Sequence, residues 1–357
     1  MAFTGTLRSN EIFTALFNMI ISQQVFADNI KGTKSSLVDK ARVDGSLYGD
    51  TKLYYATDVL SSAPWGNDAE ATNLLQLYRP QSPECQAIVL DQFRQISLTV
   101  DNYLSKRAWS TEGAFSDFNS VMLGWIRDTK RVYDSTTYNA FIGTAESTAA
   151  KGLIEIPLST ATTGLTGLDK EKMEAMTIAQ SLADLIVEMS DVSRDFNDYG
   201  YLRSYDPSDI KVIWNSKIVN KIRKVDLPTI FHKEGLMDKF EEEVLPSRYF
   251  GEINSTTKQG LADGSIRSLV EQEINGHHYF AGDSIKTTDT APAGKSYTVD
   301  ETIIAKVVVK LPPYMSVFEV GTSFFNPKSL TENHYLTFGH NTLEYLKNYP
   351  MITIGQK

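Results

Sequence analysis

Residues 209–217 indicate the fold class of this chain, and they run Asp209-Ile210-Lys211-Val212-Ile213-Trp214-Asn215-Ser216-Lys217. The first half is a short, mostly apolar run, which is typical of a buried strand. Asn and Ser often begin helices, because their side-chain oxygens accept free backbone N–H groups. Ile218, Val219 and Ile222 then fall on one helical face. The segment therefore predicts a strand, a turn and a helix, as in an α/β domain.

A long amphipathic helix is predicted before this unit. It begins at Asp169, with Glu171 and Glu174 near the helix end where the macrodipole favours acidic side chains. Its apolar positions are spaced by three and four residues, as a buried helix face requires. This stripe comprises Ala175, Ile178, Leu182, Leu185, Met189, Val192 and Phe196. We expect roughly 28 residues, or about 42 Å.

Strands are predicted on both sides of these elements. Residues 303–309 give the strongest strand signal, because β-branched residues dominate them and Pro312-Pro313 follows. Shorter strands are expected over 153–158 and 317–325, with an irregular tail after the second. A helix is expected around 236–244.

A second long helix is predicted over residues 112–142. Ser110-Thr111-Glu112 supplies a cap and an acidic first turn. Phe115, Phe118, Met122, Trp125 and Ile126 follow at three- and four-residue steps. The helix is expected to end before Gly143.

Residues 45–109 predict a long two-stranded excursion, the extended loop. Leu53, Tyr54 and Tyr55 lie in one strand-like run, and Ile96, Leu98 and Val100 alternate with polar residues in the other. Turn-forming residues surround Trp65 at the tip. Because an isolated hairpin of this kind is marginal in water, we expect a partner to cover it, and the alternative is that it folds back onto its own chain. Leu53, Tyr54, Tyr55 and Trp65 are therefore candidate subunit-interface residues.

The N-terminal segment predicts an amphipathic helix that binds a partner surface. Polar residues interrupt its apolar run over 12–26, so this run cannot span a bilayer. A secretory signal is the alternative, because Arg8 precedes the run and Val25-Phe26-Ala27 resembles a cleavage site, although Glu11 disfavours it. The candidate interface residues at helical spacing are Ile12, Phe13, Leu16, Phe17 and Ile20.

Composition excludes several classes of protein. The 357 residues include 35 basic and 44 acidic side chains, for a net charge of −9. A protein whose main work is neutralising phosphates needs an excess of Lys and Arg, so specific nucleic-acid recognition is disfavoured. The single cysteine, Cys85, excludes an internal disulfide framework and a Cys-rich metal site.

No residue is assigned a catalytic, cofactor-binding or metal-binding role. Ala293-Gly294-Lys295-Ser296 resembles the end of a phosphate-binding loop, but Asp289 stands where that motif needs its first glycine. Neither His277 and His278 nor His334 and His340 have the spacing of helical metal ligands. No Gly-x-Ser-x-Gly motif occurs. The sequence therefore predicts a protein that is not an enzyme and has no cofactor.

The order of these elements resembles the major capsid protein of tailed bacteriophages, which has the HK97-like fold. Ala140-Phe141-Ile142-Gly143-Thr144 ends the long helix in a glycine turn, as that family's spine helix ends. The helix from Asp169, followed by residues 209–217, is similar to the helix, strand and Asn-capped helix of its central domain. The resemblance covers nearly the whole chain.

The resemblance implies an α+β fold with four parts. These are an N-terminal arm (1–44), an extended β-hairpin loop or E-loop (45–109), a peripheral domain with the spine helix (110–147 and 303–357), and a central α/β axial domain (148–302). It also implies self-assembly, as pentamers and hexamers, into an icosahedral virion capsid formed in the host cytoplasm.

The partners implied are other copies of the chain, the portal and packaged double-stranded DNA bound without sequence specificity, and no membrane. No long charged segment precedes the arm. We therefore expect any scaffolding or decoration protein to be a separate chain.

Two alternatives remain open from the sequence. An encapsulin-like compartment shares the fold but encloses a cargo enzyme. A soluble or secreted hydrolase could use paired carboxylates, which leave no spacing signature.

Overall fold

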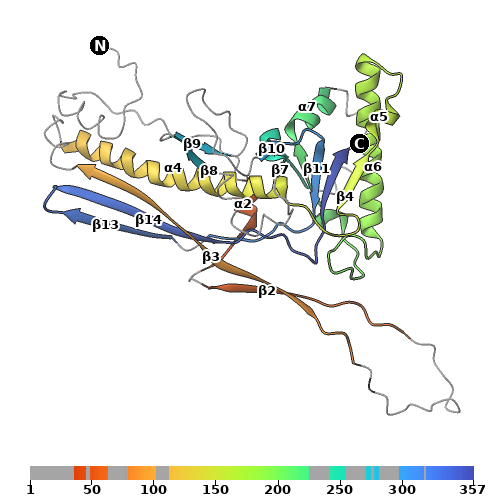
Figure 1. Ribbon diagram of the computed structural model, residues 1–357, viewed down its shortest axis with the longest axis horizontal. Coiled ribbons are helices and arrows are strands. Elements are labelled where there is room, and N and C mark those ends of the chain that lie inside the picture. The colour runs from red at the N-terminus through yellow and green to blue at the C-terminus, as the bar shows by residue number, and fades with distance from the viewer. Residues whose placement is uncertain are drawn as a thin grey trace. The chain divides into compact units, whose positions relative to one another are not determined.

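The structure is a computed structural model with mixed α and β elements, shown in Figure 1. It describes residues 36–45, 49–62, 77, 79–101, 112–224, 241–253, 271–274, 277–280, 297–316 and 319–357. These residues form two compact units. The first contains the described residues within 1–50, 90–136 and 314–341, and the second contains those within 51–89, 137–313 and 342–357.

The second unit is built on a five-stranded mixed sheet. β11 is antiparallel to both of its neighbours, whereas the two outer pairs of strands are parallel. Across the sheet the order is β4 (Leu153–Ile156), β15 (Met351–Gln356), β11 (Ile303–Val308), β5 (Lys211–Asn215) and β6 (Glu241–Leu245). The central strand β11 is buried along its whole length, so the strongest predicted strand is the centre of this sheet.

The segment over 209–217 folds as predicted. β5 is followed directly by helix α7 (Ser216–Lys224). The Asn215 Oδ1 accepts a hydrogen bond from the Lys217 N–H at 3.1 Å, and its Nδ2 donates to the Ile303 carbonyl at 3.0 Å. The buried amide therefore begins the helix and also joins β5 to β11.

Helix α6 (Gly167–Ser190) packs its predicted apolar stripe into the core of this unit. The helix has 24 residues rather than 28. Val192 and Phe196 lie beyond its end, Val192 exposed and Phe196 buried in the core. The predicted helix was too long because the apolar spacing continues beyond Ser190 into a non-helical segment, in which Phe196 packs into the same core. A short helix, α5 (Leu158–Ala161), precedes α6.

Helix α4 (Glu112–Thr144) confirms the second predicted long helix. It continues through Gly143, where a Cβ atom would lie 2.0 Å from the Tyr249 carbonyl oxygen. Glycine is needed here for a close approach of backbone, and not to end the helix. Just beyond the helix, the Ala145 carbonyl accepts a hydrogen bond from the buried Lys306 Nζ at 2.8 Å. Burial lowers the pKa of Lys306 to about 8.

The first unit contains the long strands of a second sheet, whose order is β13 (Glu319–Asn326), β14 (Thr331–Asn341), β3 (Glu84–Asp101) and β2 (Thr51–Ala56). The last pairing, of β2 with residues 84–89 of β3, falls in the second unit. In the first unit α4 packs on this sheet (Figure 1). The Tyr133 ring meets the Phe338 ring edge-on at a centroid distance of 5.5 Å. A short parallel pair, β1 (Arg42–Val43) with β12 (Tyr314–Met315), follows helix α2 (Ser36–Ala41).

Two small antiparallel pairs complete the described strands. They are β7 (Gly251–Ile253) with β10 (Tyr297–Val299), and β8 (Glu271–Ile274) with β9 (His277–Phe280). The described residues also contain the single-turn 3₁₀ helices η2 (Pro207–Asp209) and η4 (Ser247–Tyr249), which precede β5 and β7.

The structure corrects three predictions about strands. Ile96, Leu98 and Val100 alternate with exposed polar residues as predicted, but they pair with β14, and the partner of β2 is residues 84–89. The expected helix over 236–244 is wrong at its end, because 241–245 is strand β6. The tail expected to be irregular contains β14 and β15, each of which completes a sheet made by distant segments.

The strand pairing also divides the chain differently from the expected domains. We expected 303–357 to lie with the long helix in one domain. β11 and β15, however, lie in one sheet with β5, which was assigned to the other domain. Only 314–341 of that C-terminal segment belongs to the first unit.

Candidate assembly surfaces

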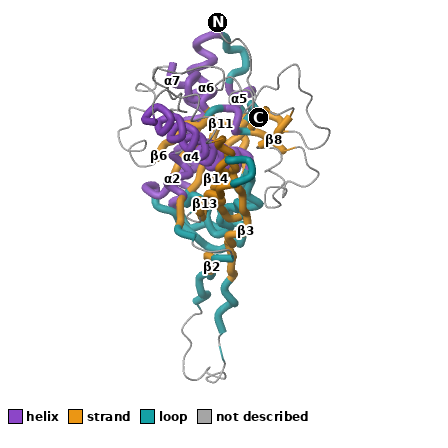
Figure 2. Tube along the Cα trace, turned by 90° about the vertical axis from the view of Figure 1, so that its left-hand side faces the viewer, coloured by secondary structure: helices purple, strands orange, loops and turns teal. Residues whose placement is uncertain are grey.

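The base of the extended loop is a two-stranded ribbon, which we define as β2 with residues 84–89 of β3 (Figure 2). In it Leu53 is paired with Ala87 and Tyr55 with Cys85, so these four side chains share one face. All four are exposed, and Tyr55 is 64% and Leu53 52% exposed. We call this the outer face of the ribbon. A contiguous apolar face of this kind is unusual on a monomer, so this face is a candidate binding surface.

The other face of the ribbon is held against its own unit. Ala56, Gln86 and Ile88 are buried there. The Gln86 Nε2 donates to the Tyr345 carbonyl at 2.9 Å, and its Oε1 accepts from the Lys347 N–H at 3.1 Å. The side-chain amide thus joins the returning strand to the segment before β15.

Lys310 provides a second attachment. Its Nζ lies 5.5 Å from the centre of the Tyr54 ring and 5.1 Å from that of the Tyr349 ring, which is the range of cation–π attraction. Burial raises the pKa of Tyr54, with a smaller contribution from Tyr349. Tyr54 therefore faces its own unit, whereas Leu53 and Tyr55 lie on the outer face.

Asp58 fixes the outgoing strand where β2 ends. Its Oδ2 lies 2.6 Å from the Arg194 Nη1, and its Oδ1 accepts from the Leu202 N–H at 3.0 Å. The neighbouring Thr57 carbonyl accepts a hydrogen bond from Arg203. The Arg194 hydrogen bond, followed by that from the Leu202 amide, lowers the pKa of Asp58 to about 2. We call these contacts, together with those of Gln86 and Lys310, the loop clamp.

Replacing Asp58 with Ala is expected to open the clamp without unfolding the unit. The Leu202 amide loses its charged acceptor, so we expect its hydrogen-exchange rate to rise about tenfold. Because the folded pKa is lowered from 3.8 to about 2, the contact is complete above pH 4 and is lost as the pH falls through about 2. Hydrogen exchange followed by mass spectrometry measures both effects.

Asp191→Ala is the matched control. Asp191 is exposed and accepts only a local hydrogen bond, from the Val192 N–H at 2.7 Å. Exchange in 199–205 should be unchanged in this variant. If the Leu202 amide exchanged at the same rate in the Asp58→Ala variant and in the parent protein, the role of Asp58 in the loop clamp would be wrong.

A buried ionic cluster in the first unit joins β1 to α4. The Asp134 Oδ2 lies 3.1 Å from the Lys130 Nζ and 3.3 Å from the Arg42 Nη2, and its Oδ1 accepts from the Tyr314 hydroxyl at 2.7 Å. The Asp134 side chain is only 2% exposed. Burial, and then the charge of Asp134, raises the pKa of Tyr314 well above its usual value. The chain that enters through α2 is thereby tied to α4.

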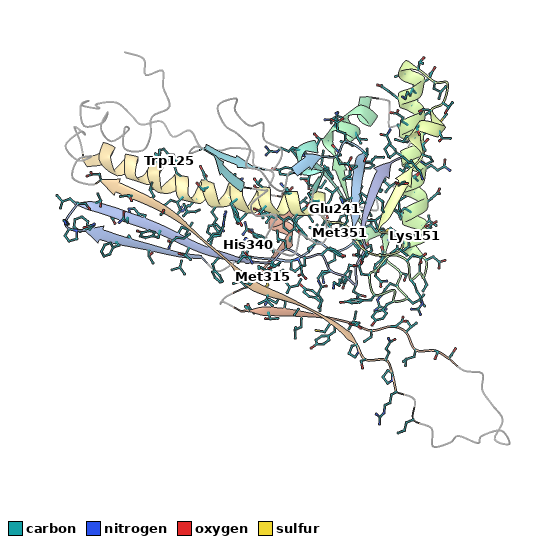
Figure 3. The ribbon with its side chains drawn as sticks, in the orientation of Figure 1. Trp125, Lys151, Glu241, Met315, His340 and Met351 are labelled. Atoms are coloured by element: carbon teal, nitrogen blue, oxygen red, sulfur yellow. The ribbon has the colours of Figure 1, made fainter. Side chains whose placement is uncertain are left out.

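His340, labelled in Figure 3, has a structural role. Its Nδ1 donates to the Asn341 carbonyl at 2.8 Å, so its Nε2 accepts the hydrogen bond from the Tyr133 hydroxyl at 2.8 Å. Among the described residues no group of three or more His, Cys, Asp or Glu side chains could hold a metal ion. No helix in the described ranges is long and apolar enough to cross a membrane.

The structure brings together some predicted interface residues but not all. Leu53 and Tyr55 share the outer face of the ribbon, and Tyr54 lies in the loop clamp. The other candidates lie outside the described residues: Ile12, Phe13, Leu16, Phe17, Ile20 and Trp65. Sequence reasoning missed Asp58 and Gln86. Their partners are more than a hundred residues away along the chain, and no spacing pattern signals such contacts.

Comparisons with known proteins agree with this architecture. A family model described as Phi29-like phage major capsid protein matches residues 6–354. No curated protein matches the chain. The chain is similar to a number of solved structures, of which three are given below, and at their low identities the similarity concerns the fold alone.

The first is the capsid structure of Staphylococcus phage Andhra, with a TM-score of 0.62, 12% identity and coverage of 94% of this chain and 87% of the other. The second is from the structure of the head fiber and inner core protein gp22 of native bacteriophage P68, with a TM-score of 0.59, 11% identity and coverage of 94% and 87%. The third is the asymmetric unit of the mature capsid of bacteriophage PhiM1, with a TM-score of 0.50, 10% identity and coverage of 94% and 92%.

Proposed function

This chain belongs to the family of Phi29-like phage major capsid proteins, and from that premise we propose how its surfaces build a shell. Copies of the chain associate as pentamers and hexamers, and these capsomers close into an icosahedral head. Contacts between unlike surfaces of successive copies generate rings when the rotation closes. The capsid protein then forms part of the virion.

The proposed arrangement is HK97-like. The spine helix is α4, which packs with β13 and β14 in a peripheral domain, and the five-stranded sheet with α6 and α7 forms the axial domain. Residues 1–44 are the arm, and the E-loop extends from residue 51 to residue 89, since residues 90–101 pair with β14. The 33 residues of α4 and the ribbon at the base of the loop support this assignment.

The observation that carries the proposal is the ribbon with one face clamped and one face apolar. The loop clamp fixes the direction of both strands within their own unit. The outer face, with Leu53 and Tyr55, is left for a neighbouring copy. Preorganisation of this kind lowers the entropy cost of association, because the ribbon is held in place before it binds.

Other parts of the proposal follow from the shell. The head encloses double-stranded DNA without reading its sequence, and a net charge of −9 suits a container that must not bind phosphates tightly. The role is structural, without catalysis. The head assembles in the host cytoplasm, with a portal and any scaffolding or decoration protein as separate chains.

Replacing Leu53 and Tyr55 with Ser tests the outer face. Because burial of each large apolar side chain contributes about 1.5–3 kcal/mol, the subunit concentration needed for assembly should rise at least about tenfold. The thermal unfolding midpoint of the free subunit should hardly change, since both side chains are exposed in it. Negative-stain microscopy and light scattering measure the assembly.

The control is the pair Leu53→Met and Tyr55→Phe, which keeps the face apolar and should assemble as the parent does. Normal assembly of the Ser variant would show that this face is not a contact. A parent protein that stays a single chain at high concentration would overturn the proposed function.

A further inference from the structure

β13 is an edge strand whose outer side has no partner among the described residues. Its inner side pairs with β14 over eight residues, from Glu319 opposite Phe338 to Asn326 opposite Thr331. It ends the strand order of its sheet, as Figure 1 shows. An edge of this kind presents backbone N–H and C=O groups that can pair with another strand.

This edge also lacks the usual protection against pairing. Residues 320–326 contain no charged residue and no proline. Phe324 is 60% and Phe325 50% exposed. By contrast, β6, at one edge of the five-stranded sheet, has three consecutive glutamates, Glu241, Glu242 and Glu243. Charged side chains on an edge strand discourage pairing with a further strand. β6 is therefore protected against such pairing, and β13 is not.

We propose that β13 pairs in antiparallel register with β13 of a second copy, across a twofold axis at Ser323. The inference rests on the proposed function, since a shell brings many copies together. In this register all seven residues of 320–326 find a partner, and Phe324 lies opposite Thr322 of the second copy. The absence of charge favours a second copy of β13 as the partner. A charged strand that paired with its own copy would place like charges opposite each other, and residues 320–326 contain no charged side chain.

Gly321 and Phe325 supply a complementary pair. They lie opposite one another in the proposed register, on the same face of the joined sheet. A Cβ atom at Gly321 would meet nothing within 4 Å, so there is room for a ring from the second copy. The same sheet already uses this arrangement, because a Phe93 ring carbon lies 2.8 Å from the Cβ position of Gly339. An aromatic ring opposite a glycine restores the packing that the glycine lacks.

The contact has a definite consequence for assembly. Because the same strand is used by both copies, the interface closes on itself and joins two subunits only. The four-stranded sheets of the two copies would then form one continuous sheet of eight strands. Ring formation is left to other surfaces, including the outer face of the ribbon, so this contact joins subunits without extending into a filament.

Cysteine cross-linking tests the register directly. The exposed Cys85 is first replaced by Ser. Ser323→Cys then places two thiols opposite each other, about 4.5–5.5 Å apart at Cα, which is within reach of a disulfide. Thr322→Cys is the matched control. It is also exposed, but its two copies would be about 8 Å apart at Cα, which is too far.

Assembled particles are oxidised and examined by non-reducing electrophoresis. We expect most chains of the Ser323→Cys particles to run as covalent dimers, and those of the Thr322→Cys particles to run as monomers. Particles with no dimer in either variant would overturn the pairing and leave the proposed function intact. Dimers in the Thr322 variant alone would overturn this register. A parent that forms no particles would overturn the proposed function and this inference with it.

Discussion

Replacing both Leu182 and Ile186 with Asp is expected to prevent folding of the second unit. The two side chains are 2% and 3% exposed and lie in the core beside the five-stranded sheet. A carboxylate buried without a partner costs several kcal/mol, so two of them together cost as much as the about 5–15 kcal/mol by which a domain is stable. Far-ultraviolet circular dichroism of the purified variant, with a thermal scan, measures the outcome.

The same helix provides the control. Met176 and Val187 are 51% and 63% exposed on the outer face of α6. Substitution of both with Asp should leave a cooperative melt, because surface substitutions change stability by about 0.5 kcal/mol or less. A cooperative melt of the Leu182 and Ile186 variant would mean that α6 does not pack on the sheet by this face.

Replacing Asp134 with Ala is expected to destabilise the first unit by about 3–5 kcal/mol, because Lys130 is left buried without its carboxylate. Arg42 and the Tyr314 hydroxyl lose the same partner. The Lys130 side chain is only 10% exposed, so water cannot replace the lost contact. Urea unfolding of the free subunit measures the change in the free energy of unfolding.

Glu188→Ala is a matched control. Glu188 lies 2.7 Å from Lys151, labelled in Figure 3, and both side chains are largely exposed. Its removal should cost less than about 1 kcal/mol, because solvent screens an exposed ion pair. Similar losses in the two variants would show that the Asp134 cluster is not effectively buried.

The elements with a strong local pattern could be predicted from the sequence. β5, α7, α6 and β11 occur where their patterns predicted them. The two strands are buried on both faces and therefore have continuous apolar runs, whereas each helix buries one face and has apolar residues at helical spacing. The errors occur where the apolar pattern extends beyond the end of the helix or strand that it predicts. Phe196 continues the stripe of α6 and reaches the same core from outside the helix.

The candidate assembly surfaces could be predicted only in part. Leu53 and Tyr55 stood out because an apolar two-stranded excursion cannot be stable alone. Asp58 and Gln86 gave no such signal. A carboxylate or an amide in a polar stretch is unremarkable until folding brings Arg194 or the backbone of Tyr345 beside it.

The sequence by itself determined the types of most of the elements, their order along the chain and the apolar faces that they bury, since these depend on residue spacing within one segment. Tertiary structure alone decided strand partners. It placed β11 and β15 in the sheet with β5, paired β14 rather than β2 with residues 90–101 of β3, and left β13 at an edge. Strand pairing depends on which segments come together after the chain has closed loops of many residues. The residue pattern within one segment does not contain this information.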